Sequence, residues 1–216
     1  SELFVHKNQF NELVRLYLKK SLPNKILLSG SKGVGKSTLA YHLINFILSI
    51  DEEYLYDLKN LSINPKNKSF KLIQNKTNPN FILVDVFEEK KNIDINQIRN
   101  LILSLNKSSF NSKPRFVLID NIELLNVNSV NALLKILEEP NDNIYFILIN
   151  NNKKMLPTLK SRCLDFKISL TQDQSISIVN NLLKIDLEDV LNKEFITHYS
   201  SPGEIFNLIN FAKKND

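Results

Sequence analysis

The strongest signal for the fold of this 216-residue chain is the segment Lys25-Ile-Leu-Leu-Ser-Gly-Ser-Lys-Gly-Val-Gly-Lys-Ser-Thr38. Residues 25–29 predict a short buried strand, and residues 36–50 follow with the pattern of a long helix. Between them, residues 30–37 match the phosphate-binding pattern G-x-x-x-x-G-K-[ST]. A chance match is the alternative, but it is disfavoured because three of the four glycines of the chain, Gly30, Gly33 and Gly35, lie in this loop.

This loop has the residues that a phosphate chain needs. Glycines permit backbone conformations that aim several N–H groups at one anion, and the following helix directs its positive end to the same point. Lys36 is predicted to reach the β- and γ-phosphates of ATP or ADP, and the Ser37 hydroxyl to ligate Mg²⁺. The predicted nucleotide-binding residues of the loop are Gly30, Gly33, Val34, Gly35, Lys36, Ser37 and Thr38.

Strands alternate with helices around this loop. Apolar runs predict further strands over 80–86, 114–120, 143–150 and 164–168, and helical spacing predicts helices over 8–20, 93–106 and 126–140, with Asp94 as a start signal. Such alternation predicts an α/β fold with a five-stranded parallel sheet that is covered on both faces. Residues 51–61 can continue the helix before them, and the polar, lysine-rich residues 62–79 predict an exposed excursion.

The pattern changes near residues 168–170. From there on strand signals are missing, and the sequence predicts three short helices. We therefore expect a nucleotide-binding α/β domain over 1–168 and a small helical domain over 169–216.

A carboxylate ends the strand predicted at 114–120. Phe116 to Ile119 are apolar and Asp120 follows them, at the edge where open α/β sheets bind ligands. Many buried strands end in Asp, so the pattern alone is weak. This strand follows the phosphate-binding loop of residues 30–37, the P-loop, in the same kind of sheet. The pattern therefore predicts a Walker B strand with Asp120 as the second contact to Mg²⁺.

Composition excludes several classes of protein. The chain is 43% hydrophobic and 24% charged, as in an ordinary globular protein, and has no apolar run of about 18 residues that could span a membrane. The N-terminus lacks the pattern of a secretion signal, which favours a cytoplasmic location. One cysteine, Cys163, and three histidines exclude a disulfide framework and a structural zinc site. The net charge of +5 is too weak to indicate a nucleic-acid partner.

Further segments carry a resemblance to a known family. Residues 131–140 read NALLKILEEP, residues 145–151 read YFILINN, and residues 156–163 read LPTLKSRC. With the P-loop, they resemble the AAA+ clamp-loader subunits, which include γ/τ and δ′ of bacterial DNA polymerase III and the small subunits of replication factor C. The resemblance extends to SPGEI at 201–205 and implies an AAA+ domain followed by a three-helix lid. These subunits continue into a helical collar domain, for which we expect no counterpart in residues 1–216.

Two departures from the family pattern bear on catalysis. In hydrolysing members, the Walker B Asp is followed by a Glu that orients water, whereas this chain has Asn121, whose amide cannot accept a proton. Glu123 is a minor candidate to replace it. Gly203 stands where active members carry the sensor 2 arginine, and Pro-Gly at this point is usual in δ′ subunits. These departures imply a δ′-like nucleotide binder with weak or absent ATPase activity. The alternative is a hydrolysing ATPase of the γ/τ or replication factor C type.

The resemblance also assigns residues outside the two Walker motifs. Arg162, in Ser-Arg-Cys, matches an arginine finger that acts in trans on the nucleotide of a neighbouring subunit, where a planar guanidinium suits the γ-phosphoryl charge. The alternative is an ordinary surface arginine. Asn150 matches the sensor 1 position, with Asn151 as the second choice, and an Asn that merely ends a strand is nearly as good an interpretation. Cys163, His42 and His198 are interpreted as structural.

The implied role is that of a stator in a clamp loader. The expected cofactors are ATP or ADP with Mg²⁺, and the expected partners are the γ/τ and δ subunits. Through the complex, the partners also include the sliding clamp and primer–template DNA. Many bacterial relatives insert a four-cysteine zinc module where this chain has residues 62–79. This segment contains no cysteine, so we expect no zinc.

Overall fold

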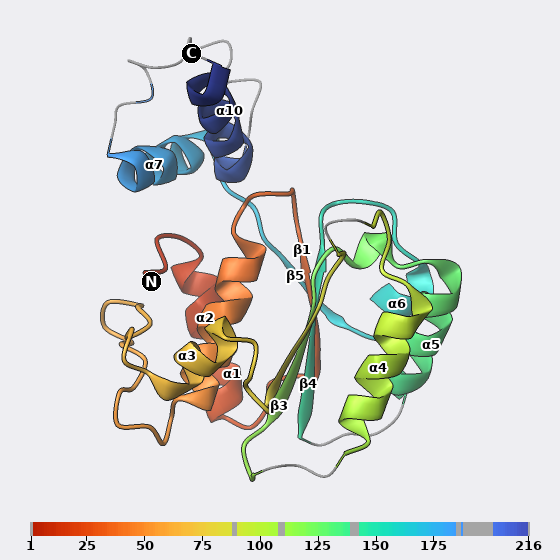
Figure 1. Ribbon diagram of the computed structural model, residues 1–216. Helices are drawn as coiled ribbons and strands as arrows, with labels where there is room; N and C mark the ends of the chain where they lie inside the picture. Colours follow the sequence, from red (N-terminus) through yellow and green to blue (C-terminus); the bar gives the residue numbers. More distant parts are fainter. Residues whose placement is uncertain are drawn as a thin grey trace.

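A five-stranded parallel sheet forms the centre of the protein (Figure 1). The computed structural model describes residues 2–87, 90–107, 111–138, 143–184, 187 and 201–215. The strands are β1 (Lys25–Ser29), β2 (Phe81–Val84), β3 (Arg115–Ile119), β4 (Ile144–Asn150) and β5 (Leu164–Lys167). They lie in the order β2-β3-β4-β1-β5, and every neighbouring pair is parallel. The predicted parallel α/β sheet is confirmed.

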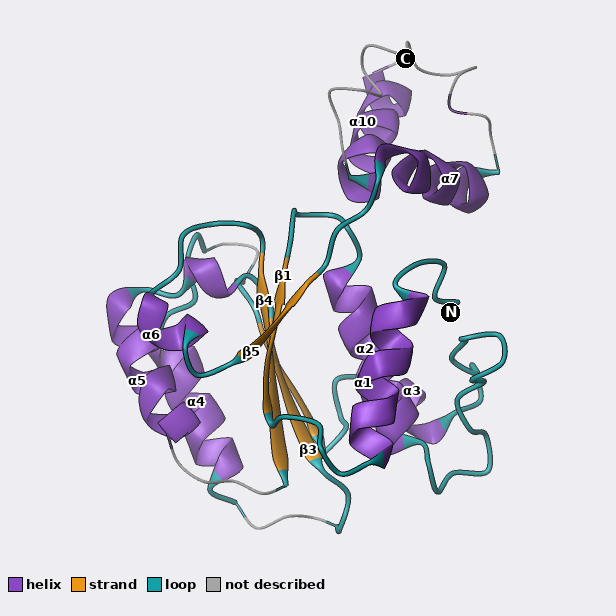
Figure 2. Ribbon diagram, turned by 180° about the vertical axis from the view of Figure 1, so that it is seen from behind, coloured by secondary structure: helices purple, strands orange, loops and turns teal. Residues whose placement is uncertain are grey.

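Helices cover both faces of the sheet. The helices are α1 (Lys7–Leu18), α2 (Lys36–Leu48), α3 (Lys68–Gln74), α4 (Ile95–Leu105), α5 (Val127–Glu138), α6 (Pro157–Lys160), α7 (Gln172–Leu183) and α10 (Pro202–Asn215), with a 3₁₀ turn at Ile122–Leu124. In Figures 1 and 2, α1, α2 and α3 lie on one face and α4, α5 and α6 on the other. The pair α7 and α10 lies apart from both layers, beyond the end of β1 where the P-loop begins.

Alternate residues of the strands feed two separate apolar cores. In β1, Ile26 and Leu28 face the core that includes α1 and α2, whereas Leu27 faces the core with α4 and α5. In β3, Phe116 and Leu118 belong to the first core, and Val117 to the second. Because both faces are buried, the strands read as continuous apolar runs.

Side-chain caps begin two of the helices where the sequence signals them. Asp94 accepts hydrogen bonds from the N–H groups of Asn96 and Gln97, and the Gln97 side chain returns a bond to the N–H of Asp94. Thr171 and Gln174 form the same capping box at α7. Capping satisfies N–H groups that have no partner inside the helix. The predicted helix start at Asp94 is confirmed.

The expectation that helix continues through residues 51–61 is wrong, because α2 ends at Leu48. Carboxylates at positions 51–53 would meet the negative end of the helix dipole. Further on, the Asp57 carboxylate accepts hydrogen bonds from the N–H groups of Lys59 and Asn60, which closes a turn instead.

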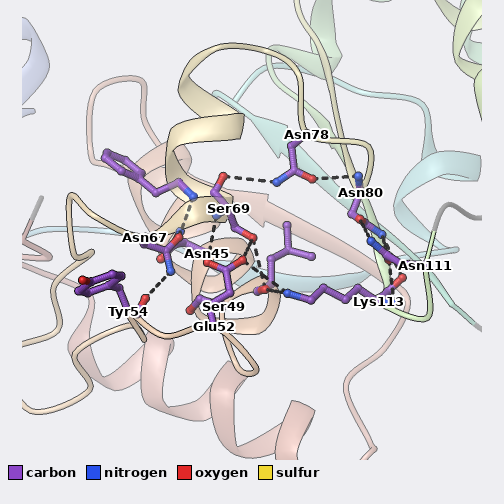
Figure 3. Close-up of polar contacts among 12 residues, drawn as sticks. Asn45, Ser49, Glu52, Tyr54, Asn67, Ser69, Asn78, Asn80, Asn111 and Lys113 are labelled. Carbon is purple, nitrogen blue, oxygen red and sulfur yellow. Dashed lines mark hydrogen bonds and ion pairs between the residues drawn. The ribbon is translucent and has the colours of Figure 1, made fainter.

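Residues 62–79 are not simply an exposed excursion, which corrects the second expectation for this region. They contain α3, whose N-cap Asn67 is fully buried. The Asn67 side chain accepts from the N–H of Phe70 at 2.7 Å, donates to the carbonyl of Tyr54 at 2.7 Å and accepts from Asn45 at 3.0 Å (Figure 3). One amide therefore joins α3, the 51–57 loop and α2.

A second group of polar contacts ties α3 to the sheet. Glu52 accepts from the N–H of Ser69 at 3.1 Å and pairs with Lys113, whose ammonium also donates to the carbonyl of Leu48 at 2.6 Å (Figure 3). Farther along, Asn80 and Asn111 exchange two hydrogen bonds of 3.0 Å. In an asparagine-rich chain these residues carry no signal that separates them from solvated ones, so the sequence could not predict the network.

The two described helices of the C-terminal region pack on each other. Val179 of α7 and Ile205 and Ile209 of α10 form a buried cluster with Leu187. The third helix expected over this region, and His198 with it, lie outside the described residues. The domain boundary at 168–170 stays a prediction.

Candidate functional site

The P-loop lies between β1 and α2, at the carboxyl edge of the sheet. Gly33 and Gly35 adopt left-handed backbone angles, with φ of 82° and 93°, and Gly35 is the residue that precedes α2. A side chain is strained at such φ values, so the two glycines meet a real requirement of the loop. A Cβ atom on Gly30 would lie only 2.0 Å from the carbonyl oxygen of Ile168, which explains the third glycine.

Lys36 is buried inside the loop. Its ammonium donates to the carbonyl oxygens of Gly30 at 2.8 Å and Ser31 at 2.5 Å, and only 3% of the residue is exposed. Burial lowers the pKa of Lys36, while the negative charges of Asp120 and Glu123 act in the opposite direction. The two carbonyl oxygens thus supply the buried Lys36 ammonium with hydrogen-bond acceptors inside the loop.

The two predicted magnesium contacts lie side by side. Ser37 Oγ, in the first turn of α2, donates to Asp120 Oδ2 at 2.6 Å. Burial raises the pKa of Asp120, and the hydrogen bonds from Ser37 and from the N–H of Asn121 oppose that shift. A hydroxyl and a carboxylate are oxygen ligands of the kind Mg²⁺ prefers, and Mg²⁺ at nucleotide sites uses few protein ligands. The described residues contain no cluster of three or more His, Cys, Asp or Glu side chains that could hold a metal.

Asn121 occupies the centre of a polar network after β3. Its backbone is left-handed, with φ of 55°. Its amide donates to Asp85 Oδ1 at 2.8 Å and accepts from Asn151 Nδ2 at 2.8 Å. Both ends of the amide are therefore engaged. Asp85, which follows β2, was missed from the sequence, although a carboxylate directly after an apolar strand is the same signal that identified Asp120.

The two sensor 1 candidates make different contacts. Asn150 is buried, and its side chain bonds only to the Lys153 backbone among the contacts described, as donor to the carbonyl and acceptor from the N–H, each at 3.1 Å. Asn151 instead donates to Asn121 and to Glu123 Oε1 at 2.9 Å. Of the two, Asn151 joins the cluster beside Asp120. The sensor 1 role stays a prediction for both.

The N-terminal segment adds a histidine that the sequence did not single out. His6 is left-handed, with φ of 63°, and its Nε2–H donates to the carbonyl oxygen of Val34 at 2.6 Å. Burial lowers the pKa of His6, and the nearby charge of Lys36 adds to that effect. Val34 is buried in this contact, whereas Thr38 is exposed in the first turn of α2. A lone histidine between the apolar residues 3–5 and the polar residues 7–9 gives no sequence signal for such a contact.

A cavity of about 500 Å³ lies between residues 4–8 of the N-terminal segment and α7. It is lined by Phe4, Val5, Lys7 and Asn8 on one side and by Asp173, Gln174, Ser177, Ile178 and Asn181 on the other.

The start of α10 rests directly on the P-loop. The N–H of Gly203 donates to the carbonyl of Gly33 at 3.1 Å. A Cβ atom at Gly203 would lie 2.8 Å from the Cα of Gly33, which is closer than real Cβ contacts allow. Ser201 and Glu204 form a reciprocal cap that begins the helix at this point. Position 203 therefore has no room for a side chain in this arrangement.

Arg162 lies outside this cluster. It follows α6, donates from Nη1 to the carbonyl of Thr158 at 2.8 Å, and pairs through Nη2 with Glu138 Oε1 at 2.5 Å. Neither partner belongs to the P-loop site. The neighbouring Cys163 packs against the core of the α4 and α5 face, where burial raises the pKa of its thiol to about 11.

Known proteins resemble this chain over most of its described length. Residues 5–172 match the family model described as "DNA polymerase III, delta subunit". DNA polymerase III subunit delta' of Pseudomonas aeruginosa is 32% identical over 138 residues, which are 63% of this chain and 40% of that protein. DNA polymerase III subunit gamma of Buchnera aphidicola from Schizaphis graminum is 32% identical over 160 residues, or 73% and 42% of the two chains.

Solved structures support the fold. A gamma subunit-related protein of Thermotoga maritima superposes with a TM-score of 0.54 at 20% identity, covering 82% of this chain and 55% of that one. The Thermotoga maritima RuvB Holliday junction branch migration motor gives a TM-score of 0.53 at 16% identity, covering 94% and 59%. At such identities the likeness shows the fold alone, and that fold is the AAA+ fold. The helical lid stays a prediction.

The extent of the match is also a finding. The chain spans about 40% of the length of the first two curated relatives. In the part of the chain that the structure describes, no helix has the length and apolar character needed to cross a bilayer. The family match over residues 5–172, with the P-loop and the Ser37–Asp120 pair in place, shows that the chain belongs to the family of DNA polymerase III clamp-loader subunits.

Proposed function

We propose that this chain acts as a δ′-type subunit of the DNA polymerase III clamp loader, which binds ATP or ADP but hydrolyses ATP poorly. The observation that carries the proposal is the amide at position 121. Asn121 follows Asp120 directly, and its amide is engaged by Asp85 and Asn151. A general base must accept a proton from the attacking water, and an amide cannot do so.

Three residues of the chain are proposed to hold the nucleotide. Lys36 exchanges its contacts with the Gly30 and Ser31 carbonyls for the β- and γ-phosphates, which its charge favours. Ser37 and Asp120, already 2.6 Å apart, hold Mg²⁺, which when bound neutralises phosphate charge. Gly203 fits the same proposal, because its close contact with Gly33 excludes a sensor 2 arginine from this position.

The second part of the proposal concerns the neighbouring subunit. Arg162 makes its contacts away from its own P-loop, so it is free to serve a nucleotide held by another chain. Its planar guanidinium then stabilises the charge on the γ-phosphoryl group. The proposed partners are γ/τ and δ subunits, and through the complex the sliding clamp and primer–template DNA. A bacterial cytoplasm is the proposed location.

Nucleotide binding and turnover test the first part. Calorimetry with Mg-ATP should show binding to the wild-type chain and a large loss of affinity in Lys36→Ala. ATP turnover of the isolated chain should stay near background, because general-base catalysis typically contributes about 10²–10⁴-fold. Absence of binding at millimolar nucleotide would refute the cofactor assignment. Steady turnover that Lys36→Ala abolishes would refute the non-hydrolysing role.

A hydrolysing ATPase is the second candidate, and one observation favours it. Glu123 lies in the same network, where its carboxylate accepts from the N–H and the side chain of Asn151. If Glu123 orients water in place of the missing carboxylate, Glu123→Gln will remove most of the ATPase activity, while Asn121→Ala will leave it. If turnover is at background in both variants and in the wild type, this candidate is rejected.

A further inference from the structure

Arg162 is held by two contacts before any partner subunit is present. Its guanidinium bonds to the carbonyl of Thr158, on α6, and to the carboxylate of Glu138, the last residue of α5. These contacts use two of the five N–H donors of the guanidinium, so the group can still donate to a phosphate. About one third of the Arg162 side chain is exposed. The arginine is thus presented at the surface in a defined orientation.

The position of Glu138 is not explained by the stability of its own helix. A carboxylate in the last turn faces the negative end of the helix dipole, which is unfavourable. The side chain is also 56% exposed, and exposed ion pairs contribute little to folding. What the pair does is join the end of α5 to the segment after the four-residue helix α6.

We propose that Glu138 is a positioning residue for Arg162. The inference rests on the proposed function, in which Arg162 serves the nucleotide of a neighbouring subunit. A free arginine side chain samples many rotamers, and fixing it at the moment of the reaction costs entropy. The contacts with Glu138 and Thr158 fix the plane of the guanidinium in advance, as catalytic groups must be oriented to be effective.

The role predicts a defined kinetic signature. In a reconstituted loader with γ/τ-type ATPase subunits, Glu138→Ala should lower kcat roughly two- to five-fold, the range set by exposed ion pairs. The KM for ATP should not rise, because orientation acts in the transition state. Glu138→Gln keeps an oxygen acceptor for the guanidinium and should recover part of the lost rate. Neither change should lower the melting temperature of the chain by more than a few degrees, in keeping with the exposure of the pair.

A double-mutant cycle separates this inference from the proposed function. Arg162→Ala should lower the rate more than Glu138→Ala does, and adding Glu138→Ala to Arg162→Ala should have no further effect. Lys90→Ala is a matched control, because it removes another exposed ion pair, with Asp94, elsewhere on the chain. It should leave the rate unchanged.

The outcomes point to different conclusions. If Arg162→Ala equals the wild type, the trans role of Arg162 fails and this inference fails with it. If Arg162→Ala lowers the rate but Glu138→Ala does not, or if Glu138→Ala lowers it equally in the Arg162→Ala background, Glu138 does not act through Arg162. In that case only the positioning role is rejected.

Discussion

Replacing Gly203 by alanine tests the contact between α10 and the P-loop. A Cβ atom at this position would lie 2.8 Å from the Gly33 Cα, whereas ordinary contacts begin at 3.4 Å, so the two backbone segments must separate by about 0.6 Å. Added to the present 3.1 Å, that movement puts the Gly203 nitrogen about 3.7 Å from the Gly33 oxygen. A hydrogen bond no longer exists at that distance.

The size of the effect follows from the place of Gly203 in its helix. Gly203 is the second residue of α10, so its N–H has no partner inside the helix. The protection of this N–H from hydrogen exchange with water therefore depends on its bond to the Gly33 carbonyl. Loss of one hydrogen bond costs about 0.5–1.5 kcal/mol, which corresponds to roughly two- to ten-fold faster exchange. Global stability should change less, because alanine is the better helix former.

Amide hydrogen exchange measured by NMR gives the readout. Protection at residue 203 should fall in Gly203→Ala and stay unchanged in Asn207→Ala, which alters an exposed residue of the same helix. Unchanged protection at residue 203 in the alanine variant would contradict the contact between α10 and the P-loop.

Three further predictions concern stability. Burial lowers the pKa of His42 from 6.5 to about 4, so the unfolded chain binds more protons than the folded chain below pH 6.5. In denaturant titrations, the contribution of His42 to the free energy of unfolding should therefore be about 2 kcal/mol lower at pH 5 than at pH 7. His42→Gln should remove that part of the pH dependence, and an unchanged slope would show that His42 does not titrate in this way. Asn67→Ala should lower the free energy of unfolding by about 2–4 kcal/mol, because it leaves the Tyr54 carbonyl and the Phe70 N–H without their partner. Asn75→Ala, at an exposed position, should lower it by less than about 0.5 kcal/mol, and equal losses would refute the importance of the network. Gly30→Ala should lower the melting temperature more than any other substitution in the loop, because its Cβ atom would lie 2.0 Å from the Ile168 carbonyl oxygen. A melting temperature equal to that of the wild type would contradict this contact.

Much of the fold could be predicted from local patterns. The apolar run before Gly30, the glycines of the loop and the Asp94 cap act over a few residues, so their signals survive in the sequence. The strand ends Ser29 and Asn150 and the carboxylate Asp120 follow from the same logic, because parallel strands end at one edge of the sheet. The pairing of Ser37 with Asp120, 83 residues apart, was predictable in kind because both belong to motifs with known positions on strand and helix.

The error over residues 62–79 has a clear physical cause. The exposed excursion is predicted there from polarity, but polarity does not say whether a side chain bonds to water or to a buried partner. Asn67 is fully buried because three groups from separate segments converge on its amide. Such convergence depends on the placement of α2, α3 and the 51–57 loop, and no local window of sequence contains it.

Residue type and short-range spacing predict the parallel α/β sheet and the phosphate-binding loop, and the family resemblance adds the missing carboxylate at position 121 and Arg162 as a candidate site residue. The packing of distant segments, by contrast, lets Lys36 bond to the loop's own carbonyls, brings Asn151 rather than Asn150 to Asn121, and places Glu138 against Arg162. The same packing brings Gly203 onto Gly33, 170 residues earlier in the chain. The reason is that these contacts join segments far apart in the chain, and their geometry is fixed by the packing of whole helices and strands rather than by the residues that meet.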